Sequence, residues 1–139
     1  MTQTNKKLHE LTIHESGEML KNGELSPVEL TQAFFNRIDE TEDRLHSFIT
    51  LLNDRAMGEA RTAEAEIRSG HYKGPMNGIP IVLKDLCDTA GIRTAWGSQV
   101  DFDRVPTEDS TETSRVAEAG ESLLGKVTMH ECALGGPEW

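Results

Sequence analysis

Residues 74–85 of the 139-residue chain read GPMNGIPIVLKD, and this stretch decides which fold the sequence can adopt. Its glycines and prolines predict a turn, and the apolar run after them predicts a buried β-strand. Lys84 and Asp85 close that run. A lysine there has an apolar stem that can lie along the strand while its amine reaches a cleft, where partial desolvation would favour the neutral form that a general base requires. Spacing alone favours a solvated lysine, because strand ends are where lysines normally reach water.

The same stretch resembles the G-P-L-x-G-I-P-[IV]-x-[IVL]-K-D segment of the amidase signature family. Similar blocks follow in the family's order and spacing, so that the resemblance extends over residues 8–136. They are residues 88–98, 117–120 and 123–131. In that family the lysine of this segment is the general base of a Ser-cisSer-Lys triad, which implies that role for Lys84. The implied fold is α/β, with N-terminal helices followed by the first strands and the crossover helix of a mixed sheet, incomplete in these 139 residues.

The resemblance also implies a reaction, the hydrolysis of a carboxylic amide without a metal or an organic cofactor. In the family both serines of the triad lie in a Gly- and Ser-rich segment some tens of residues after the strand that here contains Leu123 and Leu124. No stretch of the chain resembles that segment. We therefore expect the chain to lack the nucleophile and to be inactive alone, with Lys84 as a base that has nothing to deprotonate.

The last residues of the chain carry the other expected site. Residues 129–136 resemble the family loop that passes beneath the acyl pocket, which implies substrate contacts for Ala133, Gly135 and Gly136. Ordinary turn chemistry explains these small residues equally well.

Composition limits the partners of the protein. A formal charge of -10, from 24 acidic against 14 Lys and Arg residues, argues against nucleic acid or an anionic membrane as a direct partner. Hydrophobic residues make up 36% and aromatic residues 5%, which predicts a lean core. A lean core fits the N-terminal part of one longer domain, in which residues 1–70 are a helical lead-in and residues 71–139 begin the catalytic core.

The first residues of the chain and its cysteine content indicate the expected cellular compartment. Two lysines near the start are followed by no apolar run, so the sequence predicts neither a signal peptide nor a spanning segment, and a cytoplasmic location is expected. Cys87 and Cys132 are too few and too far apart for a disulfide framework. Reduced thiols packed as small hydrophobic side chains are predicted.

Start and stop signals predict several helices and a strand before residue 70. A capping box predicts the first helix, and a serine cap followed by proline predicts the second. An Ala- and Glu-rich stretch capped by Asn53 or Asp54 predicts the third, and a brief β-rich run precedes it. The helices are expected over about 12–22, 26–42 and 53–67, and the strand over 48–52.

The second half is expected to continue the sheet. Residues 90–94 read as a turn into a short strand, and the polar residues 101–109 read as a loop. A helix over 110–119 and a strand that begins at Leu123 and ends at residues 125–126 complete a right-handed β-α-β unit. Polar residues 121–122 enter that strand, which predicts a weak sheet edge there.

Three other chemical patterns are weaker. Residues 120–126 have the spacing of a phosphate-binding P-loop, but Val127 stands where a magnesium-binding Ser or Thr is needed. His9 and His14 are one residue too far apart for the H-E-x-x-H zinc motif, so surface histidines are predicted. Cys132 could act as a nucleophile beside Lys84, as in nitrilases, but no nitrilase pattern flanks it and a buried structural thiol is predicted.

Three classes of function remain. The first is an amidase acting on a small-molecule amide, with a homodimer of the full-length form as a further hypothesis. The second is the glutaminase part of a tRNA-dependent amidotransferase, similar to the A-type subunit of such enzymes. Leu86 and Cys87 argue against it, because those subunits usually carry Asn directly after the Lys-Asp pair. The third is a non-catalytic remnant or interaction fragment.

Overall fold

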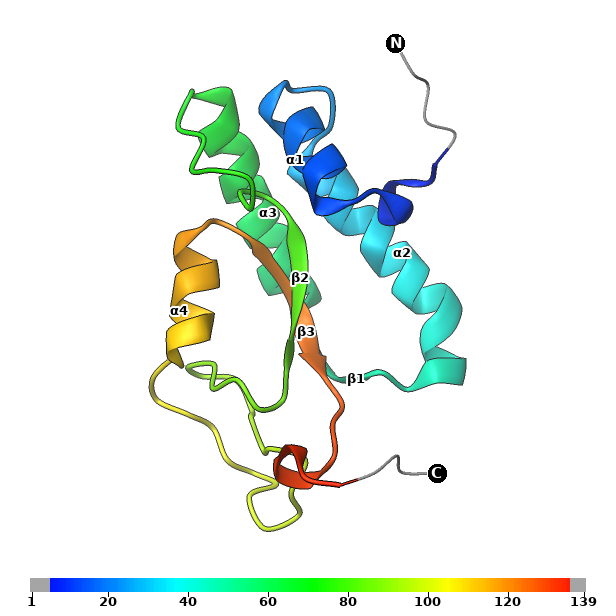
Figure 1. The fold of residues 1–139 in the computed structure, drawn as a ribbon, viewed down its shortest axis with the longest axis vertical. Coiled ribbons are helices and arrows are strands. Elements are labelled where there is room, and N and C mark those ends of the chain that lie inside the picture. Colours follow the sequence, from blue (N-terminus) through cyan, green and yellow to red (C-terminus); the bar gives the residue numbers. More distant parts are fainter. Residues whose placement is uncertain (1–5, 136–139) are drawn as a thin grey trace.

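A computed structural model of the protein describes residues 6–135. Its elements confirm the expected α/β class (Figure 1). The α-helices are α1 (Ile13–Lys21), α2 (Pro27–Leu45), α3 (Asn53–Arg68) and α4 (Thr111–Glu118), the strands are β1 (Phe48–Leu51), β2 (Pro80–Lys84) and β3 (Ser122–Val127), and the 3-10 turns are η1 (Leu8–Glu10) and η2 (Glu131–Ala133).

The starts of the first two helices follow from their caps. The Thr12 hydroxyl accepts a hydrogen bond of 3.2 Å from the Glu15 backbone N–H, and the Glu15 carboxylate accepts one of 2.8 Å from the Thr12 N–H. The Ser26 hydroxyl accepts bonds of 3.0 and 3.3 Å from backbone N–H groups in the first turn of α2, where Pro27 is the first helical residue. Both predicted helix starts are therefore confirmed.

Two predicted boundaries are wrong. Helix α2 continues to Leu45, beyond the expected end near Glu42, because the charged residues between them suit an exposed helical turn. The predicted cap of α3 by Asn53 or Asp54 is also wrong. Leu52 occupies the cap position without a side-chain hydrogen bond, and Asn53 is already helical.

The sheet has the strand order β1-β3-β2, so β3 lies in its centre. Strands β2 and β3 are parallel, as expected of a β-α-β unit, and β1 pairs antiparallel with β3. Ser122 pairs with Pro80 of β2, whereas β1 pairs only with residues from Gly125 onward. Among the described residues, the buried Ser122 hydroxyl and one Glu121 carboxylate oxygen have no hydrogen-bond partner, so the weak edge expected at residues 121–122 stays a prediction. Strand β3 also continues to Val127 instead of ending at residues 125–126.

The predicted short strand at residues 90–94 is absent, and these residues form turns. Two isolated backbone bonds hold them to the loop that follows: Gly91 N–H donates to the Pro106 carbonyl at 2.9 Å, and Thr94 N–H donates to the Arg104 carbonyl at 3.0 Å. Among the described residues these bonds do not belong to a sheet, so residues 90–94 form part of a folded loop.

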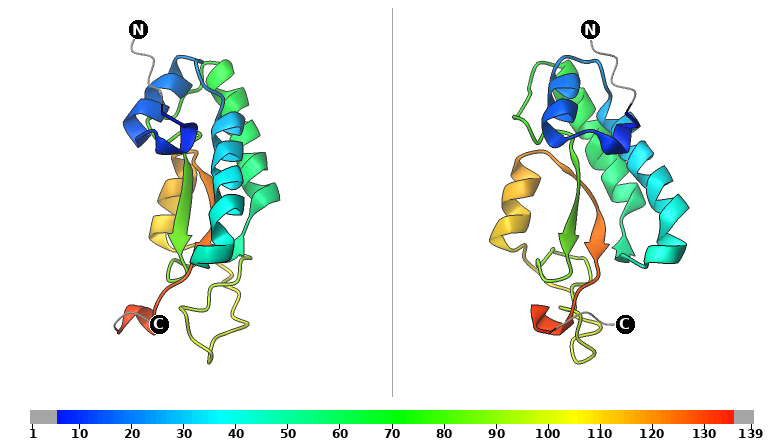
Figure 2. Two further views of the ribbon diagram at one scale, coloured as in Figure 1. Left: turned by 90° about the vertical axis from the view of Figure 1, so that its right-hand side faces the viewer. Right: turned by 45° about the vertical axis from the view of Figure 1, so that its right-hand side comes forward.

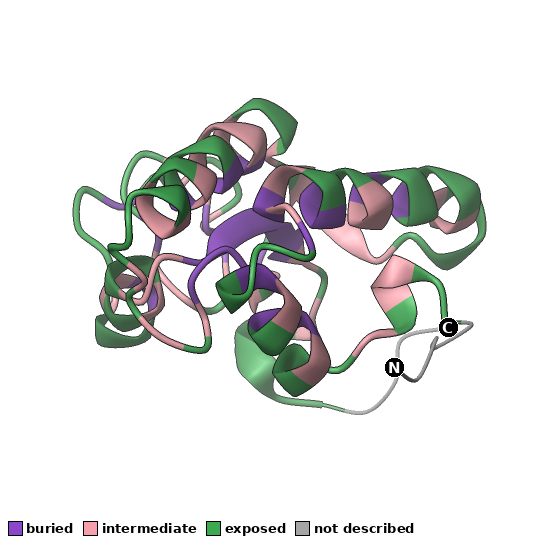
Figure 3. Cartoon of the chain, turned by 90° about the horizontal axis from the view of Figure 1, so that it is seen from above, coloured by how far each residue is buried: buried purple, intermediate pink, exposed green. Residues whose placement is uncertain are grey.

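The strands lie between helices on two sides. Helices α2 and α3 cover one side of the sheet, and α4 lies on the other (Figure 2). Some of the buried apolar side chains form two clusters under α1, α2 and α3, and Figure 3 shows buried positions on the strands and on the inward faces of the helices. The clusters are Leu20, Leu25, Leu30 and Ile79, and Phe35, Ile38, Ala56 and Leu124. Among the described residues, no helix is long and apolar enough to cross a membrane.

Candidate functional site

Lys84 is the last residue of β2, and its position in the sheet is opposite Val127, the last residue of β3. Its side chain is exposed. The partial desolvation that we expected for this lysine is therefore not provided by residues 6–135. The solvated strand-end position is what the spacing alone predicted.

Asp85 follows Lys84 directly and is only 1% exposed. Its carboxylate accepts a hydrogen bond of 3.0 Å from the Ala95 backbone N–H. Its own backbone N–H donates to the Val127 carbonyl at 3.1 Å, and its carbonyl accepts from the Trp96 N–H at 3.1 Å. Within the described part of the chain the second carboxylate oxygen has no hydrogen-bond partner. Asp85 therefore joins the end of β2 to β3 and to the loop beyond it.

The buried lysine of this region is Lys126 on β3, whose exposed fraction is 0%. Its ammonium group donates hydrogen bonds of 2.6 Å to the Cys87 carbonyl, 2.8 Å to the Thr94 hydroxyl and 3.3 Å to the Thr89 hydroxyl. Burial lowers the pKa of Lys126, and the nearby Asp85 carboxylate acts in the opposite direction. The desolvation predicted for the lysine of β2 thus acts on the lysine of β3.

Sequence reasoning missed Lys126, because we considered it only as the end of a strand and as the lysine of a P-loop. A signal was present in the run LLGKV, where a lysine interrupts the apolar residues of a strand flanked by a crossover helix. A strand paired on both sides leaves little access to water, so a lysine inside it must find internal acceptors.

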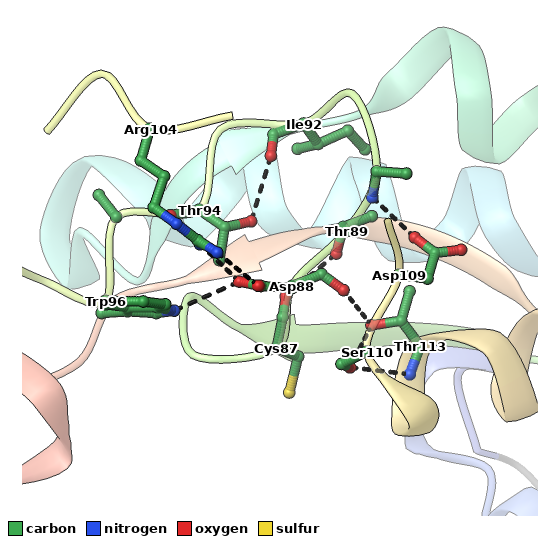
Figure 4. Close-up of polar contacts among 12 residues, drawn as sticks. Cys87, Asp88, Thr89, Ile92, Thr94, Trp96, Arg104, Asp109, Ser110 and Thr113 are labelled. Atoms are coloured by element: carbon green, nitrogen blue, oxygen red, sulfur yellow. Dashed lines mark hydrogen bonds and ion pairs between the residues drawn. The ribbon is translucent and has the colours of Figure 1, made fainter. Parts of the chain in front are cut away.

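A second polar cluster closes the loop after β2 (Figure 4). The Arg104 guanidinium donates two hydrogen bonds of 2.6 Å to the Asp88 carboxylate and lies 4.1 Å from the centre of the Trp96 ring. The Trp96 indole N–H also donates to Asp88, at 3.3 Å. Arg104 holds the pKa of Asp88 below its ordinary value. The Asp88 carbonyl accepts from the Thr113 hydroxyl at 2.7 Å, which attaches the loop to α4.

The expected substrate residues lie after β3. Ala133 and Gly135 are exposed in and after the turn η2, and Gly136 lies outside the described residues. This turn contacts the loop after β2, since the Cys132 N–H donates to the Trp96 carbonyl at 2.8 Å and the Ser98 hydroxyl donates to the Glu131 carboxylate at 2.7 Å. The segments that follow β2 and β3 therefore meet at the end of the sheet where Lys84 lies.

The cysteines differ from expectation. Both are free, but Cys132 is exposed, so the predicted buried thiol is wrong. Its backbone has a φ of 50°, in a turn at the surface of the structure. Cys87 is partly buried, and desolvation raises the pKa of its thiol. A raised pKa disfavours the thiolate that a nucleophile or metal ligand would need.

Most of the P-loop pattern lies on β3, and the two histidines of the zinc pattern lie in η1 and α1. Residues 122–127 form the central strand, and the Leu123 N–H donates to the Glu59 carboxylate at 2.9 Å, so this stretch is not a loop that cradles a phosphate as a P-loop does. His9 is partly exposed and His14 is exposed, as predicted for surface histidines. Within residues 6–135, no group of three or more His, Cys, Asp or Glu side chains could hold a metal ion.

Comparisons with known proteins identify the family of the chain. The model of the family described as Amidase matches residues 29–137. The A-type subunit of the glutamyl-tRNA(Gln) amidotransferase of Natranaerobius thermophilus is 37% identical over 129 residues, which are 93% of this chain and 26% of that protein. The corresponding protein from Dehalococcoides mccartyi, which has the same name, is 39% identical over 128 residues, 92% of this chain and 26% of that protein.

Solved structures share the fold. The native peptide amidase of Stenotrophomonas maltophilia superposes with a TM-score of 0.79 at 35% identity, over 88% of this chain and 25% of that one. A structure described as fatty acid amide hydrolase gives a TM-score of 0.84 over 93% of this chain and 23% of that one, and at 23% identity it shows the fold alone. The chain belongs to the Amidase family, which confirms the resemblance of residues 74–85. It spans about a quarter of the length of these relatives.

Proposed function

We propose that this chain is part of an amidase-type enzyme that hydrolyses a small-molecule carboxylic amide, and that Lys84 is its general base. The observation that carries the proposal is the position of Lys84. It ends one of two parallel strands that finish side by side, Lys84 opposite Val127, and the segments after both strands meet at that end. In α/β sheets, ligands bind outside the carboxyl ends of the strands.

The proposed chemistry requires a neutral amine at Lys84. The amine accepts a proton from a bridging serine, which in turn takes the proton of the nucleophilic serine as that oxygen attacks the amide carbonyl. Ammonia or an amine leaves, and water then releases the acid. We propose that both serines come from outside these 139 residues, so that residues 1–139 alone do not turn over amides.

The other predicted features belong to the same proposal. Residues 1–70 would be the helical lead-in and residues 71–139 the start of the catalytic core of one domain. Ala133, Gly135 and Gly136 would line the acyl side of the substrate site, and the enzyme would act in the cytoplasm without a cofactor. The contact of η2 with the loop after β2 supports a shared site at this end of the sheet.

A second candidate is the glutaminase part of a tRNA-dependent amidotransferase. It is favoured by the names of the curated relatives, which are A-type subunits of glutamyl-tRNA(Gln) amidotransferases. Leu86 and Cys87 after the Lys-Asp pair remain an argument against it. The candidates differ in the amide used and in assembly, since the first predicts a homodimer and the second a complex of different subunits.

The test uses the full encoded chain and measures ammonia release from glutamine and from simple carboxylic amides. Lys84→Met should lower kcat by roughly 10³-fold or more, as expected for loss of a member of a triad. Lys21→Met, at the exposed end of α1, is the control and should leave kcat unchanged. Full activity of Lys84→Met would exclude Lys84 as the base, and turnover of glutamine alone would favour the amidotransferase.

A further inference from the structure

A buried ammonium group lies under the segment that follows the proposed catalytic lysine. Lys126 has no solvent exposure, and its three acceptors all belong to residues 87–94, directly after Lys84 and Asp85. They are one backbone carbonyl and two hydroxyl groups, so the lysine holds the loop through contacts that no apolar side chain could make.

Stability alone does not explain a lysine at this position. Removing an ammonium group from water is costly, and a well-packed apolar side chain of similar size is often as stabilising or more so. A buried charge with fixed acceptors instead favours one conformation over its alternatives, since every other loop conformation leaves the charge unpaired. The three hydrogen bonds of Lys126 therefore favour the observed conformation of residues 87–94.

That conformation reaches Lys84 through Asp85. The Asp85 carboxylate is buried, accepts from the Ala95 N–H, and attracts the Lys126 ammonium electrostatically. Lys84 and Asp85 share a peptide bond, so fixing Asp85 also helps to hold the backbone of Lys84, which is paired with Val127. Lys84 lies opposite Val127 and Lys126 opposite Leu83. Because adjacent strand residues alternate between faces, the side chains of Lys84 and Lys126 leave opposite faces of the sheet. The two amines therefore contact different groups.

We propose that Lys126 is a positioning residue, which holds residues 85–94 by its hydrogen bonds to Cys87, Thr89 and Thr94 and thereby orients Lys84 for proton transfer. This inference rests on the proposed function of Lys84. It assigns no contact with substrate to Lys126. Misplacing a catalytic group by about 1 Å can cost on the order of 10²-fold in rate, so loss of the ammonium group should affect the chemical step.

The kinetic test compares variants of the full encoded chain. Lys126→Met keeps an unbranched side chain out to the ε position and removes the ammonium group. We expect kcat to fall at least tenfold while KM changes less than twofold, because the amide is bound by other residues. Thr94→Val removes one acceptor and keeps the side-chain shape, and a smaller fall in kcat, again without a change in KM, is expected. Lys21→Met, which removes an exposed lysine, is the control and should leave kcat unchanged.

A second readout does not depend on turnover. In protein with ¹³C-labelled lysine side chains, the Lys84 signal is assigned by its loss in Lys84→Met. In Lys126→Met and in Thr94→Val this signal should shift and broaden, while the signals of surface lysines stay in place. The Thr94 variant keeps the inference testable where the Lys126 variant does not fold.

Each result of these experiments either supports or overturns the proposed role of Lys126. Folded Lys126→Met and Thr94→Val variants with unchanged kcat and an unchanged Lys84 signal would overturn it. A rise in KM with unchanged kcat would also overturn it, since that result indicates a role in substrate binding. Retained turnover in Lys84→Met would instead overturn the proposed function, and the Lys84 signal then decides whether Lys126 orients that side chain.

Discussion

The ammonium group of Lys126 lies 2.6 Å from the backbone carbonyl oxygen of Cys87. This contact joins the central strand β3 to the loop that begins after β2. The shape of the loop therefore depends in part on a charge supplied from a strand that comes 39 residues later in the chain.

The same loop depends on the paired geometry of Arg104 and Asp88. Arg104→Lys should lower the free energy of unfolding by about 1–2 kcal/mol, because lysine cannot make the two parallel hydrogen bonds or stack on the Trp96 ring. Urea unfolding measures the change. Arg93→Lys is the matched control, since Arg93 stacks on the partly exposed Phe102 ring and should cost under about 0.5 kcal/mol. Equal losses of unfolding free energy in Arg104→Lys and Arg93→Lys would show that the contact of Arg104 with Asp88 adds no stability.

Glu121 should make the stability of the fold depend on pH. Burial, and then the nearby Glu59 carboxylate, raise its pKa from 4.5 to about 7, with Arg55 acting in the opposite direction. The folded state therefore binds this proton more tightly than the unfolded state. The contribution of Glu121, which is 7% exposed, is most favourable below pH 4.5 and is lost as the pH rises through about 7, on the order of 2–3 kcal/mol in all.

Urea unfolding at several pH values checks this prediction. Glu121→Gln should flatten the profile between pH 4.5 and 7, and the exposed Glu118→Gln should not change it. An unchanged slope in Glu121→Gln would assign the pH dependence to other groups.

Gly125 is required by the close approach of β1 to β3. A Cβ atom there would collide with the Thr50 carbonyl oxygen and would lie 3.0 Å from the Phe48 ring. Gly125→Ala should destabilise the fold by about 3 kcal/mol, because the obstruction includes backbone of the paired strand. Gly58→Ala, in α3, meets nothing within 4 Å and should stabilise the fold by about 0.5–1 kcal/mol. Thermal unfolding of Gly125→Ala and Gly58→Ala tests these two predictions. Similar changes in stability in the two variants would contradict them.

Ser26 connects two helices. Its hydroxyl caps α2 and donates a hydrogen bond of 2.6 Å to the Glu64 carboxylate on α3. Ser26→Ala should lower the free energy of unfolding by about 1–2 kcal/mol, the upper part of the range for a helix cap, because the carboxylate also loses its donor. The exposed Ser69→Ala is the control and should change it by less than about 0.5 kcal/mol.

Local signals in the sequence predicted most of the fold. The caps at Thr12 and Ser26, the apolar run before Lys84 and the helix between β2 and β3 depend on residues within one or two turns, so the sequence pattern contains the information. The strand expected at residues 90–94 failed because it needed a neighbouring strand, and pairing is decided by distant parts of the chain. The pairing of β1 with β3 was not predicted for the same reason.

By itself, the sequence determined the class of the fold, the starts of the first helices and membership of the Amidase family through residues 74–85. Only the tertiary structure decided that Lys126 is buried and Lys84 exposed, and that Cys132 lies at the surface. Both lysines follow apolar residues near a strand end, so their local patterns are alike. Burial depends on which strand lies in the centre of the sheet and which loop covers it, and those contacts join residues far apart in the chain.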